Sequence, residues 1–408
     1  MAGLVMLCLV WGAVAAWVVS QRASGASEVV SVSAPVRLDG EQIYRSLSDA
    51  DATAARAFLS GGLEPAAARR RYQEDIAVAA SRLEAATAAA GRSAAAKDLA
   101  ALSVSLPVYA GEVETARADN RLGLPLGAAY LREASGLMRG TLLPAAREVS
   151  AEANSQLSAA SGQATGLPLA LVLLAIAALV GYTLFRAQRW LFRRTHRVLN
   201  PGLVVASVAA VVSLLWLGIA LGVARADLLR ARAQGSAPVA ALAQADVAAL
   251  QAHADESLTL IDAGGDDSFQ ADFLAVQHRL GPGPGTLLTS AVAATRGSPG
   301  AGAAAAAATT ATAWYGAHRT VRFLDDNGKH IQAVHQVTTP GPDHSGTLFT
   351  RLDGSLTRAI AADQAVFKAN AIAGRNAFTG LEVGVIVLAL IMAAGCARGL
   401  NKRLAEYR

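Results

Sequence analysis

The sequence predicts an all-α membrane protein in which four transmembrane helices carry two extracytoplasmic four-helix-bundle domains. Two observations lead to this class. Four stretches of the chain are apolar enough to cross a bilayer, and the long segments between them repeat apolar residues at steps of three and four. The mean hydropathy of +0.35, with 53% hydrophobic but only 5% aromatic residues, is typical of membrane segments joined to alanine-rich helices.

The four apolar stretches divide the chain into alternating spans and connections. A helical span needs about 20 predominantly apolar residues. The predicted spans are residues 1–19, 167–185, 203–223 and 380–396. They separate an outer segment at 20–166, an arginine-rich loop at 186–202, a second outer segment at 224–379 and a tail at 397–408.

The first apolar stretch has a rival interpretation as a cleaved signal peptide. No basic residue precedes it, which argues against a signal peptide, and the bulky Leu7 before Cys8 argues against a lipoprotein site. We therefore expect an uncleaved span, with further cytosolic residues upstream of it.

Lysine and arginine bias predicts the orientation. The loop contains RAQRWLFRRTHR, which has five arginines and no acid, and the tail ARGLNKRLAEYR is also basic. Both features predict a multi-pass plasma-membrane protein whose N- and C-termini lie in the cytosol. Because the basic residues gather beside apolar runs, they indicate membrane topology and not nucleic-acid binding.

The first outer segment shows the stripes of four helices. Gly61 and Gly62 are expected to end the first helix, Glu64 and Pro65 to begin the second, and Pro107 to kink or break the third. The stripes are Ile43, Leu47, Ala50, Ala54 and Phe58; Tyr72, Ile76, Ala79 and Leu83; Leu99, Leu102, Leu106, Tyr109 and Val113; and Leu131, Ser135, Met138, Leu142 and Val149. Together they predict an up-down-up-down bundle.

The second outer segment repeats this plan less regularly. The stretch around Asn327 and Gly328 fits a β-hairpin or a helix–turn–helix, and the helical pattern on both sides favours the latter. Gly218 with Gly222, and Gly380 with Gly384, have the small-xxx-small spacing that brings membrane helices close together.

No pattern in the sequence predicts catalysis, a cofactor or a metal site. The chain has no phosphate-binding loop, no dinucleotide fingerprint and no paired cysteine motif, and Cys8 and Cys396 both lie inside apolar runs. His330 and His335 are spaced wrongly for one helix face. We therefore expect no enzyme activity.

So little of the chain is expected in the cytosol that a separate protein must receive any signal. The arginine-rich loop is the best cytosolic docking surface, although topology and lipid binding alone also account for it. The candidate partner-binding residues are Arg186, Arg189, Trp190, Arg193, Arg194 and Arg197.

The stretch RLDGEQIYRSLSDADATAARAFLSGGLEPAAARRRYQEDI, with the later LTRAIAADQAVF and the four-span plan, resembles the GlnX-type membrane proteins of actinobacteria. The resemblance implies a relay. A periplasmic amino-acid-binding lipoprotein, GlnH, senses acidic amino acids, and the membrane protein passes the signal to a cytosolic Ser/Thr kinase of the PknG type. The resemblance supplies no catalytic residues.

Two other functions stay open, as does assembly into a homo-oligomer. A chemoreceptor-like sensor would bind a small ligand directly and gather charged residues at an outer bundle interface, for example around Arg45, Asp49 and Asp51. A relay would instead expose a patch at the membrane-distal bundle tips. A structural cell-envelope protein would need neither.

Overall fold

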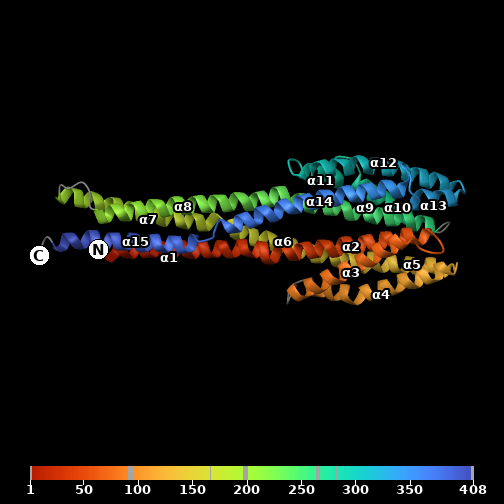
Figure 1. Ribbon diagram of the computed structural model, residues 1–408, viewed down its shortest axis with the longest axis horizontal. Helices are drawn as coiled ribbons and strands as arrows, with labels where there is room; N and C mark the ends of the chain where they lie inside the picture. Colours follow the sequence, from red (N-terminus) through yellow and green to blue (C-terminus); the bar gives the residue numbers. More distant parts are fainter. Residues whose placement is uncertain are drawn as a thin grey trace. The chain divides into compact units, whose positions relative to one another are not determined.

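The computed structural model describes residues 2–90, 95–165, 167–195, 201–262, 267–281 and 283–405. Within these ranges every regular element is a helix and no strand occurs, which confirms the all-α prediction. The chain forms two compact units (Figure 1). We call residues 1–32, 157–231 and 368–408 the apolar unit, and residues 33–156 and 232–367 the polar unit.

The apolar unit contains the helices that are predicted to span a membrane. Four helices of the described chain are long and apolar enough to do so, which supports the membrane-protein class. The helices that lie wholly in this unit are α1 (Ala2–Glu28), α7 (Leu167–Thr195), α8 (Pro201–Ala231) and α15 (Leu381–Ala405).

Glycines let three of these helices approach closely. A Cβ atom added to Gly12 would lie 2.4 Å from Ala389, and one added to Gly202 would lie 2.5 Å from the carbonyl oxygen of Gly395. Both contacts bring α15 against a neighbour, α1 in the first case and α8 in the second. Of the two glycine pairs expected to bring α8 and α15 together, Gly384 does approach α8, because an added Cβ there would lie 2.3 Å from Trp216. Gly218 and Gly222 take no part, because added Cβ atoms there would meet nothing within 4 Å. Small residues at those positions therefore serve no close contact.

The first and last helices of the chain can be tested as neighbours through their cysteines. The Sγ atoms of Cys8 and Cys396 lie 3.9 Å apart in a buried position. With a protease site inserted into the exposed loop at 60–65, mild oxidation should leave the two cleaved fragments joined until a reductant is added. The two fragments of the Cys8→Ser variant should separate whether or not a reductant is added. Fragments that separate without reductant in the wild type would contradict the packing of α1 on α15.

The first segment of the polar unit follows the predicted stripes. It contains α2 (Ala34–Leu59), α3 (Ala66–Ala90), α4 (Ala96–Arg121), α5 (Leu126–Leu137) and α6 (Leu143–Thr165). Two short π-helical turns, η1 (Val29–Ser33) and η2 (Met138–Leu142), precede α2 and α6. Ile43, Leu47, Leu131, Leu142 and Val149 share one buried cluster, as predicted. Pro107 lies inside the uninterrupted α4, so the chain does not break there.

The second segment of the polar unit has more helices than a four-helix bundle. A third π-helical turn, η3 (Arg232–Ser236), leads into α9 (Ala237–Ile261). There follow α10 (Ser268–Leu280), α11 (Leu287–Ala294), α12 (Ala301–Asp326), α13 (His330–Thr338) and α14 (Ser345–Asn376). The turn between α12 and α13 contains Gly328 at φ 72°, which confirms the helix–turn–helix.

Both segments lie in the same compact unit, where α2 packs against α9. The structure therefore does not confirm two separate bundle domains. The reason is visible in α9, whose residues from Ala245 to Leu258 are all buried except the half-buried Gln251, so the helix is covered on nearly every side. A helix covered all round needs neighbours from both segments.

Candidate functional site

Helix α9 buries four ionisable side chains: Asp246, His253, Asp255 and Glu256. Burying a charge is costly unless the charge is paired and hydrogen-bonded. The partners of these four residues therefore show how the polar unit is held together, and they come from α2, η2, α12 and α14.

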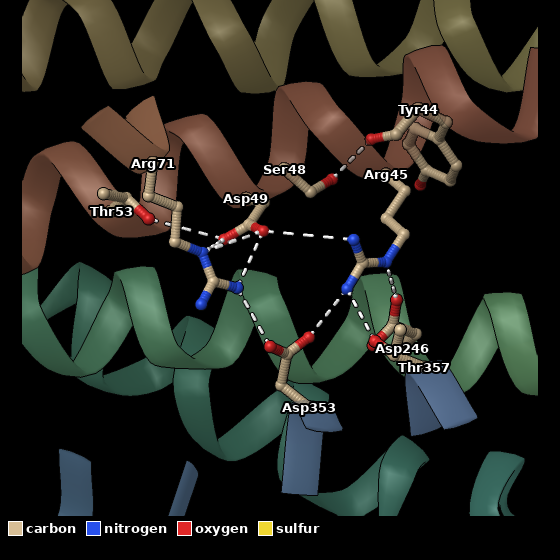
Figure 2. Close-up of polar contacts among 9 residues, drawn as sticks. All are labelled: Tyr44, Arg45, Ser48, Asp49, Thr53, Arg71, Asp246, Asp353 and Thr357. Carbon is tan, nitrogen blue, oxygen red and sulfur yellow. Dashed lines mark hydrogen bonds and ion pairs between the residues drawn. The ribbon is translucent and has the colours of Figure 1, made fainter. Parts of the chain in front are cut away.

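Asp246 belongs to a charge network that joins the two segments (Figure 2). Arg45 of α2 donates from Nε to Asp246 of α9 at 2.6 Å and from Nη2 to Asp353 of α14 at 2.8 Å. Arg71 of α3 donates from Nη2 to the other oxygen of Asp353 at 2.9 Å. It also holds Asp49 of α2 through Nε and Nη2, at 3.1 and 2.8 Å.

Asp353 is the bridge of this network, since each of its carboxylate oxygens accepts from a different guanidinium group. Burial lowers the pKa of Arg45 and Arg71, but the neighbouring carboxylates outweigh burial and raise both pKa values. Both arginines are therefore firmly charged. The network clamps the first segment to the second.

An open, polar pocket of about 520 Å³ lies beside the network. It is lined by Arg45, Asp49, Ala67, Arg70, Arg71, Glu74, Asp75, Asp353, Gly354 and Thr357. Guanidinium groups and carboxylates share its wall, so the pocket offers partners for both ends of a small zwitterion.

Asp75 is the carboxylate of this pocket whose charge is least supported. Its Oδ2 is buried and has no hydrogen-bond partner among the described residues. Burial, followed by repulsion from Asp49, raises the pKa of Asp75 to about 8. An ammonium group bound in the pocket would stabilise the charged form of this carboxylate.

The raised pKa of Asp75 predicts how the stability of the protein depends on pH. A carboxyl whose pKa is higher in the folded state contributes stability below its unfolded pKa, near 4, and loses it as the pH rises through about 8. Asp75→Asn should therefore flatten the fall in stability across this range, which thermal unfolding at a series of pH values would measure. Parallel curves for the variant and the wild type would refute the assignment.

Asp51 lies in a different cluster from Arg45 and Asp49. It accepts a hydrogen bond from Ser135 Oγ at 2.8 Å, and Arg139 Nε lies 4.0 Å from its Oδ2. Arg139, on the turn η2, also pairs with Asp255 of α9 and with Asp272 at 3.6 Å. This cluster is a second link between the segments and lines none of the described pockets.

Glu256 is the centre of a third buried group. It accepts from Nδ1 of His318 at 2.9 Å and of His253 at 3.4 Å, and from Ser345 Oγ at 2.7 Å. Burial alone raises the pKa of Glu256, but the two histidines overcome it and lower that pKa to about 2. Each imidazole also stacks on a phenylalanine ring. The group stabilises the core of the second segment.

The end of the polar unit where α2 stops is unusually apolar. Leu63, in the loop after α2, is 85% exposed, and Ile331, on α13, is also 85% exposed. Leu59 of α2 packs against the cluster that joins α12 to α13, so both segments meet at this end. We call this area the tip surface; its exposed apolar residues are Leu63, Leu122, Leu124, Leu126, Phe323 and Ile331.

The predicted arginine-rich loop is largely helical, because α7 extends through Thr195. No glycine or proline interrupts the chain between Phe185 and Thr195, which explains the extension. Arg186, Arg189, Trp190 and Arg193 are exposed on this helix. Arg194 belongs to the helix, and Arg197 lies outside the described residues.

Sequence reasoning found Arg45 and Asp49 but missed their partners. Asp246 and Asp353 lie far along the chain, and their only signal is an acid inside an otherwise apolar helical stripe. Arg71 lies in a run of three arginines that reads as a solvated helix face.

Comparison with known proteins gives a sensor family for the first segment. The family model described as Actinobacterial sensor domain matches residues 25–162. The matched range contains the whole of α2 to α5 and supports an actinobacterial sensor protein with a role in sensing or signalling. No curated protein matches the chain. No solved structure matches it either.

Proposed function

We propose that this protein is a transmembrane signal relay. In this proposal, a periplasmic amino-acid-binding lipoprotein docks on the polar unit, and the apolar helices pass its state to a cytosolic Ser/Thr kinase. The tip surface is the observation that carries the proposal, because a relay needs an exposed docking patch on its outer part. Both termini and the arginine-rich segment then lie in the cytosol, in accordance with the positive-inside rule.

The tip surface has the chemistry of a protein interface. A groove of about 230 Å³ beside it is lined by Phe58, Leu63, Asn120 and Arg121, among others. Exposed apolar side chains beside an arginine fit the plan of a protein interface, in which an apolar centre is surrounded by polar groups. The loops that carry these leucines follow α2 and α4.

The cytosolic contact is proposed on one row of α7. Arg186 and Trp190 lie four residues apart and therefore on the same face of the helix. The Arg186 guanidinium also lies over the ring of Tyr182, 5.9 Å from its centroid, which extends the row by one turn. A kinase could bind this row through carboxylates paired with arginine and through the indole.

Charged substitutions in the tip surface should test the docking. Leu63→Asp with Leu122→Asp, in the full-length protein purified in detergent, should weaken binding of the glutamate-loaded lipoprotein at least about tenfold, as expected for apolar anchors. Surface plasmon resonance would measure it. Val104→Asp is the matched control, because Val104 is 72% exposed on α4 and outside the tip surface.

The docking proposal fails if the double variant binds like the wild type. It also fails if Val104→Asp weakens binding as strongly. Equal melting temperatures of all variants exclude misfolding as the cause of a loss.

A second candidate function is direct sensing, and the charged pocket beside the network favours it. Guanidinium groups and the unpaired Asp75 would hold the carboxylate and the ammonium group of an amino acid. In calorimetry without any partner, free glutamate or aspartate should then bind stoichiometrically, and Asp75→Asn should abolish the binding. The absence of heat with the wild type would leave the relay as the proposal.

A further inference from the structure

An apolar groove of about 200 Å³ lies inside the apolar unit, between α7 and its neighbours. Its walls come from α1, α7, α8 and α15. The lining residues are Trp11, Ala177, Val180, Gly181, Leu184, Phe185, Gln188, Ser207, Ala210, Val211, Leu214 and Met392.

Small side chains on α7 and α8 leave the space of this groove unfilled. Ala177 and Gly181 of α7 and Ala210 of α8 are among the residues that line it. Such residues usually let membrane helices approach closely, yet a Cβ added to Gly181 would meet nothing within 4 Å. At Gly12 and Gly202 the same test gives contacts of 2.4 and 2.5 Å. The small side chains of α7 therefore leave space for something other than a neighbouring helix.

One end of the groove is polar and lies near exposed arginines. Gln188 Nε2 donates to Ser207 Oγ at 2.9 Å and closes the apolar part. Phe185 lines the groove, and Arg189 and Arg193 follow it at steps of four residues, so all three lie in one row along α7. Both arginines are exposed.

We propose that the groove binds an acyl chain of an anionic phospholipid, whose phosphate is held by Arg189 and Arg193. The charge of the segment selects this occupant, because residues 186–197 contain five arginines and no acid. The apolar wall takes the chain, and the arginine row begins where the wall ends. The inference rests on the membrane placement that belongs to the proposed function.

The bound lipid leaves the proposed partner row of α7 accessible. Arg186 and Trp190 lie on a neighbouring row, about 100° around the helix from Phe185 and Arg189. Lipid and cytosolic partner would thus use adjacent faces of one helix end.

Native mass spectrometry of the full-length protein would test the site. The protein, purified in a neutral detergent, is mixed with phosphatidylglycerol or with phosphatidylcholine of the same acyl chains. Phosphatidylglycerol should be retained and should raise the melting temperature, whereas phosphatidylcholine and glycerol 3-phosphate should do neither. Arg189→Gln with Arg193→Gln should weaken retention roughly 10- to 30-fold, as expected for two arginines at an anionic surface.

Two further variants separate the groove from general charge. Gly181→Leu fills the space and should abolish retention with both arginines intact. Arg225→Gln with Arg230→Gln removes two exposed arginines elsewhere in the apolar unit and should leave retention unchanged.

Equal retention of both lipids, protection by glycerol 3-phosphate alone, or normal retention by Gly181→Leu would each overturn the proposal. An effect of the control pair as large as that of Arg189→Gln with Arg193→Gln would also overturn it. All variants should still fractionate with membranes and bind the lipoprotein, so failure of the lipid site is distinguishable from failure of the relay.

Discussion

Leu131→Asp should unfold much of the polar unit. Leu131 is 1% exposed and belongs to the core cluster that α2, α3, α4 and α5 build together. A carboxylate at this position would lose its hydration and would be surrounded by apolar side chains, so the free energy of unfolding should fall by about 3–5 kcal/mol. Thermal unfolding of the full-length protein, followed by circular dichroism, would measure the loss.

Leu126→Asp is the matched control for this variant. Leu126 lies on the same helix but is 55% exposed, so the same substitution should change the melting temperature little. Similar losses at both positions would show that the burial of Leu131 is assigned wrongly.

Asp353→Ala should release the clamp between the two segments of the polar unit. It leaves Arg45 and Arg71 without the carboxylate that they share. Removing one partner of a buried pair typically costs about 3–5 kcal/mol, but both arginines keep some water, so we expect about 2–3 kcal/mol here. Hydrogen exchange should accelerate most in α9 and α14, where the bridge is lost.

Asp326→Ala is the corresponding control. Asp326 pairs with Arg322 at 2.6 Å, but its side chain is 58% exposed. Solvent-exposed pairs contribute about 0–1 kcal/mol, so stability should hardly change. If Asp353→Ala and Asp326→Ala lower the free energy of unfolding equally, the network does not hold the two segments together.

The sequence predicted the helices well wherever an apolar stripe was regular. The stripe from Ile43 to Phe58 became α2, and the turn at Gly61 and Gly62 ended it at Leu59. Local rules suffice there, because period, glycine and proline act within a few residues. At Pro107 the same rules failed, since α4 continues through it and its buried face packs in the core of the first segment.

The site was harder to predict because its partners are far apart in the chain. Arg45 and Asp353 are 308 residues apart, and the sequence around either residue does not predict that the other is its partner. Asp51 illustrates the opposite error. It lies two residues from Asp49, but two residues turn a helix by about 200°, so it belongs to another cluster.

The π-helical turns η1 and η3 have a consequence for how the helices of the chain can vary. Each lies where an apolar helix, α1 or α8, continues into a helix of the polar unit without a non-helical residue between. A π turn holds an extra residue relative to an α turn, and such turns are frequent at functional sites. Deleting one residue from η1 would therefore allow plain α-helix and leave the later residues on nearly the same faces, whereas deleting one residue within α2 would turn them by about 100°. The extra residue in each turn thus keeps Arg45 and Asp246 on their present faces, and η1 and η3 are the places where the chain can lose a residue without turning those faces.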